Sequence, residues 1–232
     1  AGYVAISGGF GLGPALTWVQ AAYDYANYYS ASSYSSLTST YLAGTLTTGD
    51  LFAAYGSNLL AYPYTITRLD YQFVAQGINV SQYGSVSKAS SLSSLSGYLN
   101  KIEVSSLAYG KITILGYDNV ALYGDGTISS VTWEHNGATM TMTGSLTAST
   151  SVGVDGYYHA TIAGTYTAAT FSYASQTMQL SGISVNSNSS FASATDFLAL
   201  ALSGNDQVNG TSGTDLLNGY AGNDTLTGGT GN

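Results

Sequence analysis

Cysteine, charge and long apolar runs are what this sequence lacks. No Cys occurs among its 232 residues, so disulfides, thiolate catalysis and most structural zinc sites are excluded. Charged residues make up 7% of the chain, far below the roughly 25% of an ordinary soluble domain. The four Lys and Arg residues are too few for a basic stripe, which argues against a nucleic-acid partner. No stretch approaches about 18 apolar residues, so no membrane insertion is expected.

The charges that are present are mostly acidic. Twelve Asp and Glu residues leave a net charge of −8, and most of them are Asp, the short carboxylate that calcium loops favour. A surface made of Ser, Thr, Asn, Gly and Tyr repels copies of itself only weakly, so we expect self-association into a homopolymer. The composition therefore favours a hard cation as ligand and an assembly as the working state.

A nine-residue period runs through the C-terminal part of the chain. Glycines at residues 204, 213, 222 and 231 keep this step, as do Asp206, Asp215 and Asp224 and the apolar residues Val208, Leu217 and Leu226. In such a period six residues form a turn whose oxygens point at an ion, and three form a short strand with its apolar residue inward. The candidate calcium ligands are Gly204, Asn205, Asp206, Gly213, Thr214, Asp215, Gly222, Asn223 and Asp224.

These residues resemble the repeats-in-toxin (RTX) family of bacterial exported proteins, from about Leu202 to Asn232. The resemblance implies Ca²⁺ as cofactor, an extracellular or cell-surface location, and type I secretion without a cleaved signal peptide. It also implies repeats that fold only when calcium is plentiful. Leu202, Thr211 and Tyr220 stand where the family has a second Gly. With three copies, we expect about one or two ions.

The first part of the chain, residues 1–100, is predicted to be mixed α/β. Pro14 suits the first position of a helix over Ala15 to Ala31. Asp50 is predicted to cap a second helix that ends near Tyr62. Further along, the pattern predicts a strand over residues 64–80 and a short helix or a loop over residues 90–100.

Residues 101–201 show the period of two that is typical of strands, and they are expected to form one domain with residues 1–100. Asn136-Gly137 is the clearest hairpin turn. The predicted strands cover residues 101–108, 111–117, 127–135, 138–147, 157–165 and 169–185. We therefore expect a mostly β protein with some helix near the N-terminus. An antiparallel β-sandwich or meander is followed by a short calcium-binding parallel β-roll over residues 202–232, incomplete at the C-terminus.

The other candidate sites give weaker indications of a function. His135 and His159 invite a catalytic role, but neither an H-E-x-x-H nor a G-x-S-x-G motif occurs, so we expect no enzymatic activity. Asp118 and Asp125 flank a short segment that is either a plain turn or a second ion site. A crowd of tyrosines suits a packed helix flank, a subunit contact or a sugar-binding surface, and it includes Tyr23, Tyr25, Tyr28, Tyr29, Tyr34 and Tyr41.

Three functions remain open at this point. The first is a secreted calcium-binding structural protein, a subunit of an extracellular filament, surface layer or biofilm matrix. The second is an adhesin-like module that binds glycans or a cell surface. The third is an exported enzyme of the RTX family with an unrecognised active site.

Overall fold

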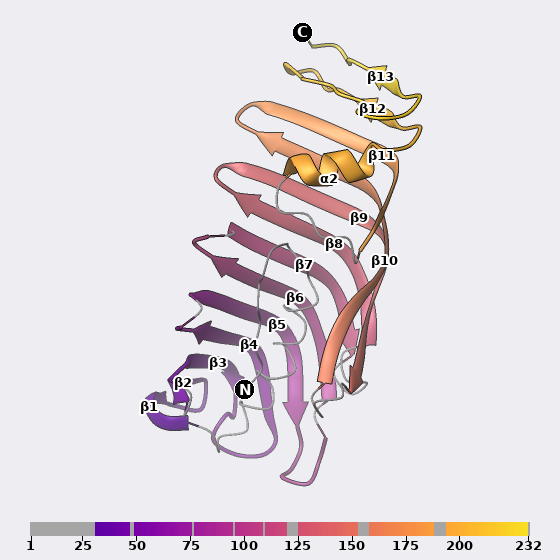
Figure 1. The fold of residues 1–232 in the computed structure, drawn as a ribbon. Helices are drawn as coiled ribbons and strands as arrows, with labels where there is room; N and C mark the ends of the chain where they lie inside the picture. Colours follow the sequence, from indigo (N-terminus) through magenta and orange to yellow (C-terminus); the bar gives the residue numbers. More distant parts are fainter. Residues whose placement is uncertain are drawn as a thin grey trace.

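The computed structural model describes residues 31–46, 49–75, 77–94, 96–108, 110–119, 125–152, 158–187 and 194–231. This part forms one 13-stranded sheet in which the strands lie side by side in chain order (Figure 1). Neighbouring strands are antiparallel except β12 and β13, which are parallel. The strands are β1 (Ala31–Leu37), β2 (Tyr41–Leu46), β3 (Leu51–Ser57), β4 (Tyr64–Phe73), β5 (Ile78–Lys88), β6 (Ser96–Ser106), β7 (Gly110–Asn119), β8 (Asp125–His135), β9 (Ala138–Val152), β10 (Tyr158–Tyr173), β11 (Gln176–Asn186), β12 (Gln207–Asn209) and β13 (Thr225–Thr227).

The sheet is therefore the predicted meander and not a sandwich. Helix α2 (Ala194–Ala201) lies against one face, which we call the inner face. The Phe197 ring of α2 lies 5.9 Å from the ring of Phe171 and 6.3 Å from that of Tyr166. No helix of the described residues is long and apolar enough to cross a membrane.

Alternation along each strand places one apolar row across the inner face. Side chains directly opposite one another on successive strands bury each other, so the register is fixed by this row. Its members are buried in the middle and exposed at both ends, and Gln82 is its one polar residue. The inner row runs through Leu37, Leu42, Ala54, Leu69, Gln82, Ile102, Ile114, Val131, Met142, Ala169, Leu180, Val208 and Leu226.

The long strands bend in the middle (Figure 1). Every antiparallel pair from β3–β4 to β10–β11 contains a register shift, and β-bulges increase local bending and twist. Near these register shifts, glycine allows the backbones of neighbouring strands to approach closely. A Cβ at Gly56 would overlap the Thr65 carbonyl oxygen, and one at Gly164, where φ is +122°, would overlap that of Ser145. The bend gives the inner face its concave shape.

The helix predicted from Asp50 to Tyr62 is wrong, because residues 51–57 form β3. Both edges of β3 are paired, with β2 on one side and β4 on the other. Asp50 does not cap a helix; its carboxylate accepts a hydrogen bond from the backbone N–H of Val74 at 3.1 Å. Pairing on two sides outweighs the local helical preference of Leu51 to Ala54.

Several other boundaries also differ. The strand predicted over residues 64–80 is two strands, β4 and β5, and residues 96–100 belong to β6 rather than to a helix or loop. The segment 169–185 spans a turn at residues 174–175 that separates β10 from β11. The helix predicted over residues 15–31 falls almost wholly outside the described residues, and Ala31 belongs to β1. The division of the chain into three parts stays a prediction.

Candidate calcium site

The first repeat, residues 203–208, is anchored in the core of the sheet. Helix α2 precedes it, and the Ser203 hydroxyl donates a hydrogen bond of 2.9 Å to the Leu200 carbonyl at the end of that helix. Leu202 and Val208 are fully buried, and Val208 pairs with Leu180 of β11. The first repeat therefore continues the sheet.

The third repeat, residues 222–226, stacks on the first. Leu226 pairs with Val208 in parallel. The backbone N–H of Asp206 donates to Oδ1 of Asp224 at 3.0 Å, and the N–H of Asn223 donates to Oδ1 of Asn205 at 2.9 Å, in both cases across 18 residues. Turns that are two nine-residue repeats apart therefore lie in register with each other.

Gly222 permits this stacking. Its φ is +135°, which L side chains rarely adopt, and a Cβ there would overlap the Gly204 carbonyl oxygen. The turn of the first repeat, with the Gly204 carbonyl and Asp206, therefore meets the turn of the third repeat, with the Asp224 carboxylate, at one junction. Oxygen donors of these two kinds are the ligands that calcium prefers.

The second repeat, residues 213–217, lies apart from that junction. Asp215 Oδ2 accepts a hydrogen bond of 2.6 Å from the backbone N–H of Thr211, and both of its carboxylate oxygens lie 3.3 Å from the Thr211 hydroxyl. A Cβ at Gly231 would overlap the Gly213 carbonyl oxygen, so this repeat stacks with the residues around Gly231. Of the nine predicted ligands, Gly213, Thr214 and Asp215 thus belong to a second location.

Electrostatics at the junction suit a cation. Asp206 is only 8% exposed, and burial of an uncompensated carboxylate is costly. Its carboxylate accepts a hydrogen bond of 3.3 Å from the Gly204 N–H. The sequence contains no Lys or Arg beyond Lys111. The donor set therefore fits Ca²⁺, although the ligand role of the nine residues stays a prediction. No group of three or more His, Asp or Glu side chains converges within the described residues.

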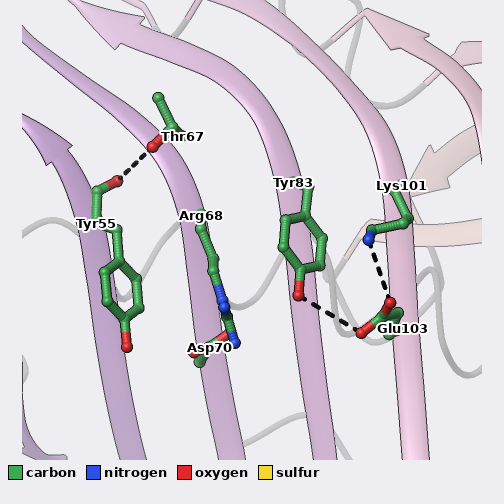
Figure 2. A network of polar contacts seen from close by, with 7 residues as sticks. All are labelled: Tyr55, Thr67, Arg68, Asp70, Tyr83, Lys101 and Glu103. Atoms are coloured by element: carbon green, nitrogen blue, oxygen red, sulfur yellow. Dashed lines mark hydrogen bonds and ion pairs between the residues drawn. The ribbon is translucent and has the colours of Figure 1, made fainter.

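A second polar cluster lies on the face of the sheet opposite the inner face, which we call the outer face (Figure 2). We call Tyr41, Tyr55, Arg68, Tyr83 and Lys101 the outer row, since they sit directly opposite one another on β2 to β6. The Arg68 guanidinium lies 5.2 Å from the ring centres of both Tyr55 and Tyr83, and the Lys101 ammonium lies 4.0 Å from that of Tyr83. Cations packed on aromatic rings in this way are attracted by the ring electrons.

Carboxylates neutralise the outer row. Arg68 Nε bonds Oδ1 of Asp70 at 2.8 Å, and this hydrogen bond raises the pKa of the guanidinium. Lys101 lies 3.3 Å from Glu103, and the Tyr83 hydroxyl lies 3.5 Å from the same carboxylate. Burial, followed by the nearby Tyr41, raises the pKa of the Tyr55 hydroxyl. The outer row is thus a cross-strand brace that the linear sequence does not reveal.

The other predicted sites find little support in the described residues. Nε2 of His135 lies 3.1 Å from the side-chain amide of Asn136, and its ring stacks on Trp133. His159, Asp118 and Asp125 have described backbones in β10, β7 and β8, but their side chains lie outside the description. Of the tyrosine crowd, the structure describes Tyr34 against Phe52 and Tyr41 against Tyr55; Tyr23, Tyr25, Tyr28 and Tyr29 lie outside the described residues.

Comparison with known proteins agrees with the geometry of the repeats. Residues 201–232 match the family described as RTX calcium-binding nonapeptide repeat (4 copies). No curated protein and no solved structure is significantly similar to the chain. The predicted resemblance is confirmed, and so is Ca²⁺ as the cofactor of the repeats, which are typical of exported bacterial proteins.

Proposed function

Because residues 201–232 are RTX calcium-binding repeats, we propose that this chain is a secreted structural protein whose sheet is stabilised by Ca²⁺. It acts outside the cell as a subunit of a filament, a surface layer or a biofilm matrix. In the calcium-bound state the repeats form a short parallel β-roll. Self-association supplies the assembly, without nucleic acid and without membrane insertion.

The observation that carries this proposal is the continuity of the sheet into the repeats. The inner row passes from Leu180 of β11 to Val208 of β12 and Leu226 of β13. Asp206 and Asp224, with backbone oxygens of Gly204 and Gly222, are the residues that would hold Ca²⁺ between the turns that precede β12 and β13. The ion supplies positive charge that offsets the two carboxylates. Calcium binding therefore stabilises the end of the sheet itself.

The outer face supports association between copies. Thr113, Thr132, Thr141 and Thr170 lie opposite one another on β7 to β10, and the hydroxyls of Thr132 and Thr141 are 3.0 Å apart. A neutral hydroxyl surface on a regular sheet presents no repulsive charge to a second copy. This surface suits lateral packing of subunits.

A calcium titration followed by circular dichroism and negative-stain microscopy tests the proposal. Calcium is expected to raise the melting temperature and to produce regular assemblies, and chelation is expected to reverse both. A strictly monodisperse monomer at high protein concentration in millimolar calcium contradicts the assembly. An unchanged melting temperature after chelation contradicts the role of Ca²⁺.

An adhesin-like module is the second candidate, and one pair of rings favours it. Tyr98 and Tyr117 stack with ring centres 5.6 Å apart and are 37% and 53% exposed. Exposed aromatic faces are common at binding surfaces. Binding on a glycan array that disappears in Tyr98→Ala and Tyr117→Ala, while Tyr173→Ala retains it, would support this function over assembly alone.

We further propose that the chain has no enzymatic activity. His135 has its described side-chain contacts with Asn136 and Trp133, neither of which is a nucleophile or an acid. A screen of the purified chain against hydrolase substrates is expected to find no turnover above that of the His135→Ala and His159→Ala variants. Turnover that is lost in either variant would contradict the proposal.

A further inference from the structure

A cavity of about 450 Å³ lies where the sheet, helix α2 and the second repeat meet. Its floor is formed by side chains of β8 to β11, and Leu198 of α2 closes one side. Asp215 and Leu216 of the second repeat line another side, where Leu216 is 85% exposed. Volumes of roughly 300–1,000 Å³ are typical of pockets for small organic ligands. The inferred function of the chain does not use this cavity.

The floor alternates aromatic rings with thioethers. Trp133, Met140, Phe171 and Met178 lie directly opposite one another on four successive strands. The imidazole of His135, which also lines the cavity, stacks on Trp133 with ring centres 6.1 Å apart and an interplanar angle of 11°. Methionine side chains adapt their shape and make favourable contacts with aromatic rings. Such a floor suits a planar ring system.

The charge of the lining residues further limits the class of ligand. The lining includes the Asp215 carboxylate and no Lys or Arg, and all four cations of the chain precede residue 112. An anionic ligand, such as a fatty acid, would find no Lys or Arg side chain in the described lining to pair with its charge. We propose that this cavity binds an uncharged, apolar molecule with a planar aromatic ring system.

Calcium controls access to the proposed site because one wall belongs to the repeats. Asp215 is held by Thr211 through the turn of the second repeat, and Leu217 of the same repeat packs against the core. Without calcium this wall loses the stacking that positions it. Binding of the ligand and binding of calcium are therefore linked: each raises the affinity of the protein for the other by the same factor.

Nile red, a neutral planar dye, tests the site in the full chain. The chain contains two tryptophans, so Trp18→Phe leaves Trp133 as the reporter in the cavity. Calcium-loaded protein is expected to bind the dye saturably with quenching of Trp133 emission, and chelation is expected to release it. The anionic dye ANS is expected to bind at least about tenfold more weakly, which corresponds to about 1.4 kcal/mol.

Matched variants decide whether the cavity is the place of binding. Leu198→Trp fills the cavity from α2 and is expected to weaken Nile red binding at least about tenfold. Leu92→Ser removes a side chain that is 97% exposed on the β5–β6 turn and is expected to leave binding unchanged. Unaltered binding in a folded Leu198→Trp variant overturns the site. If that variant does not fold, dye binding without quenching of Trp133 overturns it instead.

Two further outcomes are decisive. Equal affinity for ANS and Nile red contradicts the proposed ligand class. If sedimentation velocity shows that the dye competes with dimer formation, a second copy occupies the cavity and the small-molecule proposal fails. The comparison of ANS with Nile red does not depend on whether calcium produces filaments, so this inference and the proposed structural function are tested separately.

Discussion

At the scale of single residues, Gln82 is the least expected member of the core. It is 1% exposed in the inner row between Leu69 and Ile102, and neither its amide oxygen nor its amide nitrogen has a hydrogen-bond partner among the described residues. A buried amide without partners costs free energy on folding. The row would be apolar throughout if this position held a hydrophobic side chain.

We therefore expect Gln82→Met to stabilise the protein. Methionine has nearly the same shape and removes both unsatisfied groups, so the free energy of unfolding should rise by about 1–2 kcal/mol. Urea denaturation in calcium measures this. Gln72, exposed on the neighbouring strand β4, is the control, and Gln72→Met should change stability by less than ~0.5 kcal/mol. A loss of stability in Gln82→Met would show that the amide has a partner.

Tyr166 is a second buried group with an unsatisfied atom. It is 1% exposed, and within the part of the chain that the structure describes its hydroxyl has no hydrogen-bond partner. Burial raises its pKa far above the ordinary value. Above about pH 10 the unfolded chain ionises this hydroxyl while the folded chain keeps it protonated. Stability linked to Tyr166 is therefore complete below that pH and falls as the pH rises further.

The Tyr166→Phe variant is expected to resist alkaline unfolding. Because phenylalanine has no ionisable hydroxyl, the midpoint of unfolding between about pH 10 and 12 should move to higher pH, as measured by circular dichroism. At pH 7 the variant should be at least as stable as the parent chain. Tyr173→Phe, at a position 62% exposed, should leave the alkaline midpoint unchanged. An identical midpoint in Tyr166→Phe would mean that other groups control it.

At the scale of elements, the outer row braces strands β2 to β6 from the solvent side. Arg68 contacts two rings and one carboxylate, whereas Lys111 contacts Glu134 alone at 3.2 Å among the interactions described. Both side chains are more than 40% exposed, so the ion pairs themselves contribute little. The contacts of Arg68 with the rings of Tyr55 and Tyr83 are therefore expected to make Arg68 contribute more to stability than Lys111.

We expect Arg68→Met to lower the free energy of unfolding by about 1 kcal/mol, because the cation packed between two rings is lost. Lys111→Met should change it by less than ~0.5 kcal/mol. Urea denaturation at low and at high salt measures both, and the Arg68 effect should persist in high salt because ring contacts are screened less than exposed ion pairs. Equal effects at the two positions would contradict a bracing role of the rings.

At the scale of the whole molecule, β12 and β13 of the repeats continue the sheet, and the net negative charge of the chain lies beyond Lys111. The sequence beyond Lys111 contains acids and no Lys or Arg. Calcium is therefore expected to act on the stability of the entire sheet. At a calcium concentration 100 times the Kd, the stabilisation should be about 2.7 kcal/mol for each site.

The pairing of repeats predicts which aspartates act together. Asp206 and Asp224 meet at one junction, so Asp206→Asn and Asp224→Asn should each remove the same calcium-dependent stabilisation, and the double variant should lose no more than either single one. Asp215→Asn should act additively with both, because Asp215 belongs to the second repeat. The readout is the difference in melting temperature between calcium and chelator. Additive losses at residues 206 and 224 would contradict a shared site.

The sequence by itself determined the repeats, their metal and most of the strands after residue 100. Alternating residues and the Asn136-Gly137 turn mark strands through local patterns. β8 begins and ends close to the predicted positions and β9 begins at the predicted residue, although β9 continues to Val152, beyond the predicted end at residue 147. A nine-residue period carries both the metal donors and their spacing. Such features depend on neighbours within the chain, and a sequence displays them directly.

Only the tertiary structure decided how these pieces meet. Residues 51–57 became a strand because β2 and β4 pair with both of its edges, and segment 194–201 became a helix over Phe171. Which aspartates share a junction, which rings enclose Arg68 and which side chains line the cavity all depend on register. Register follows from the mutual burial of side chains that lie far apart in the chain, and no local pattern specifies it.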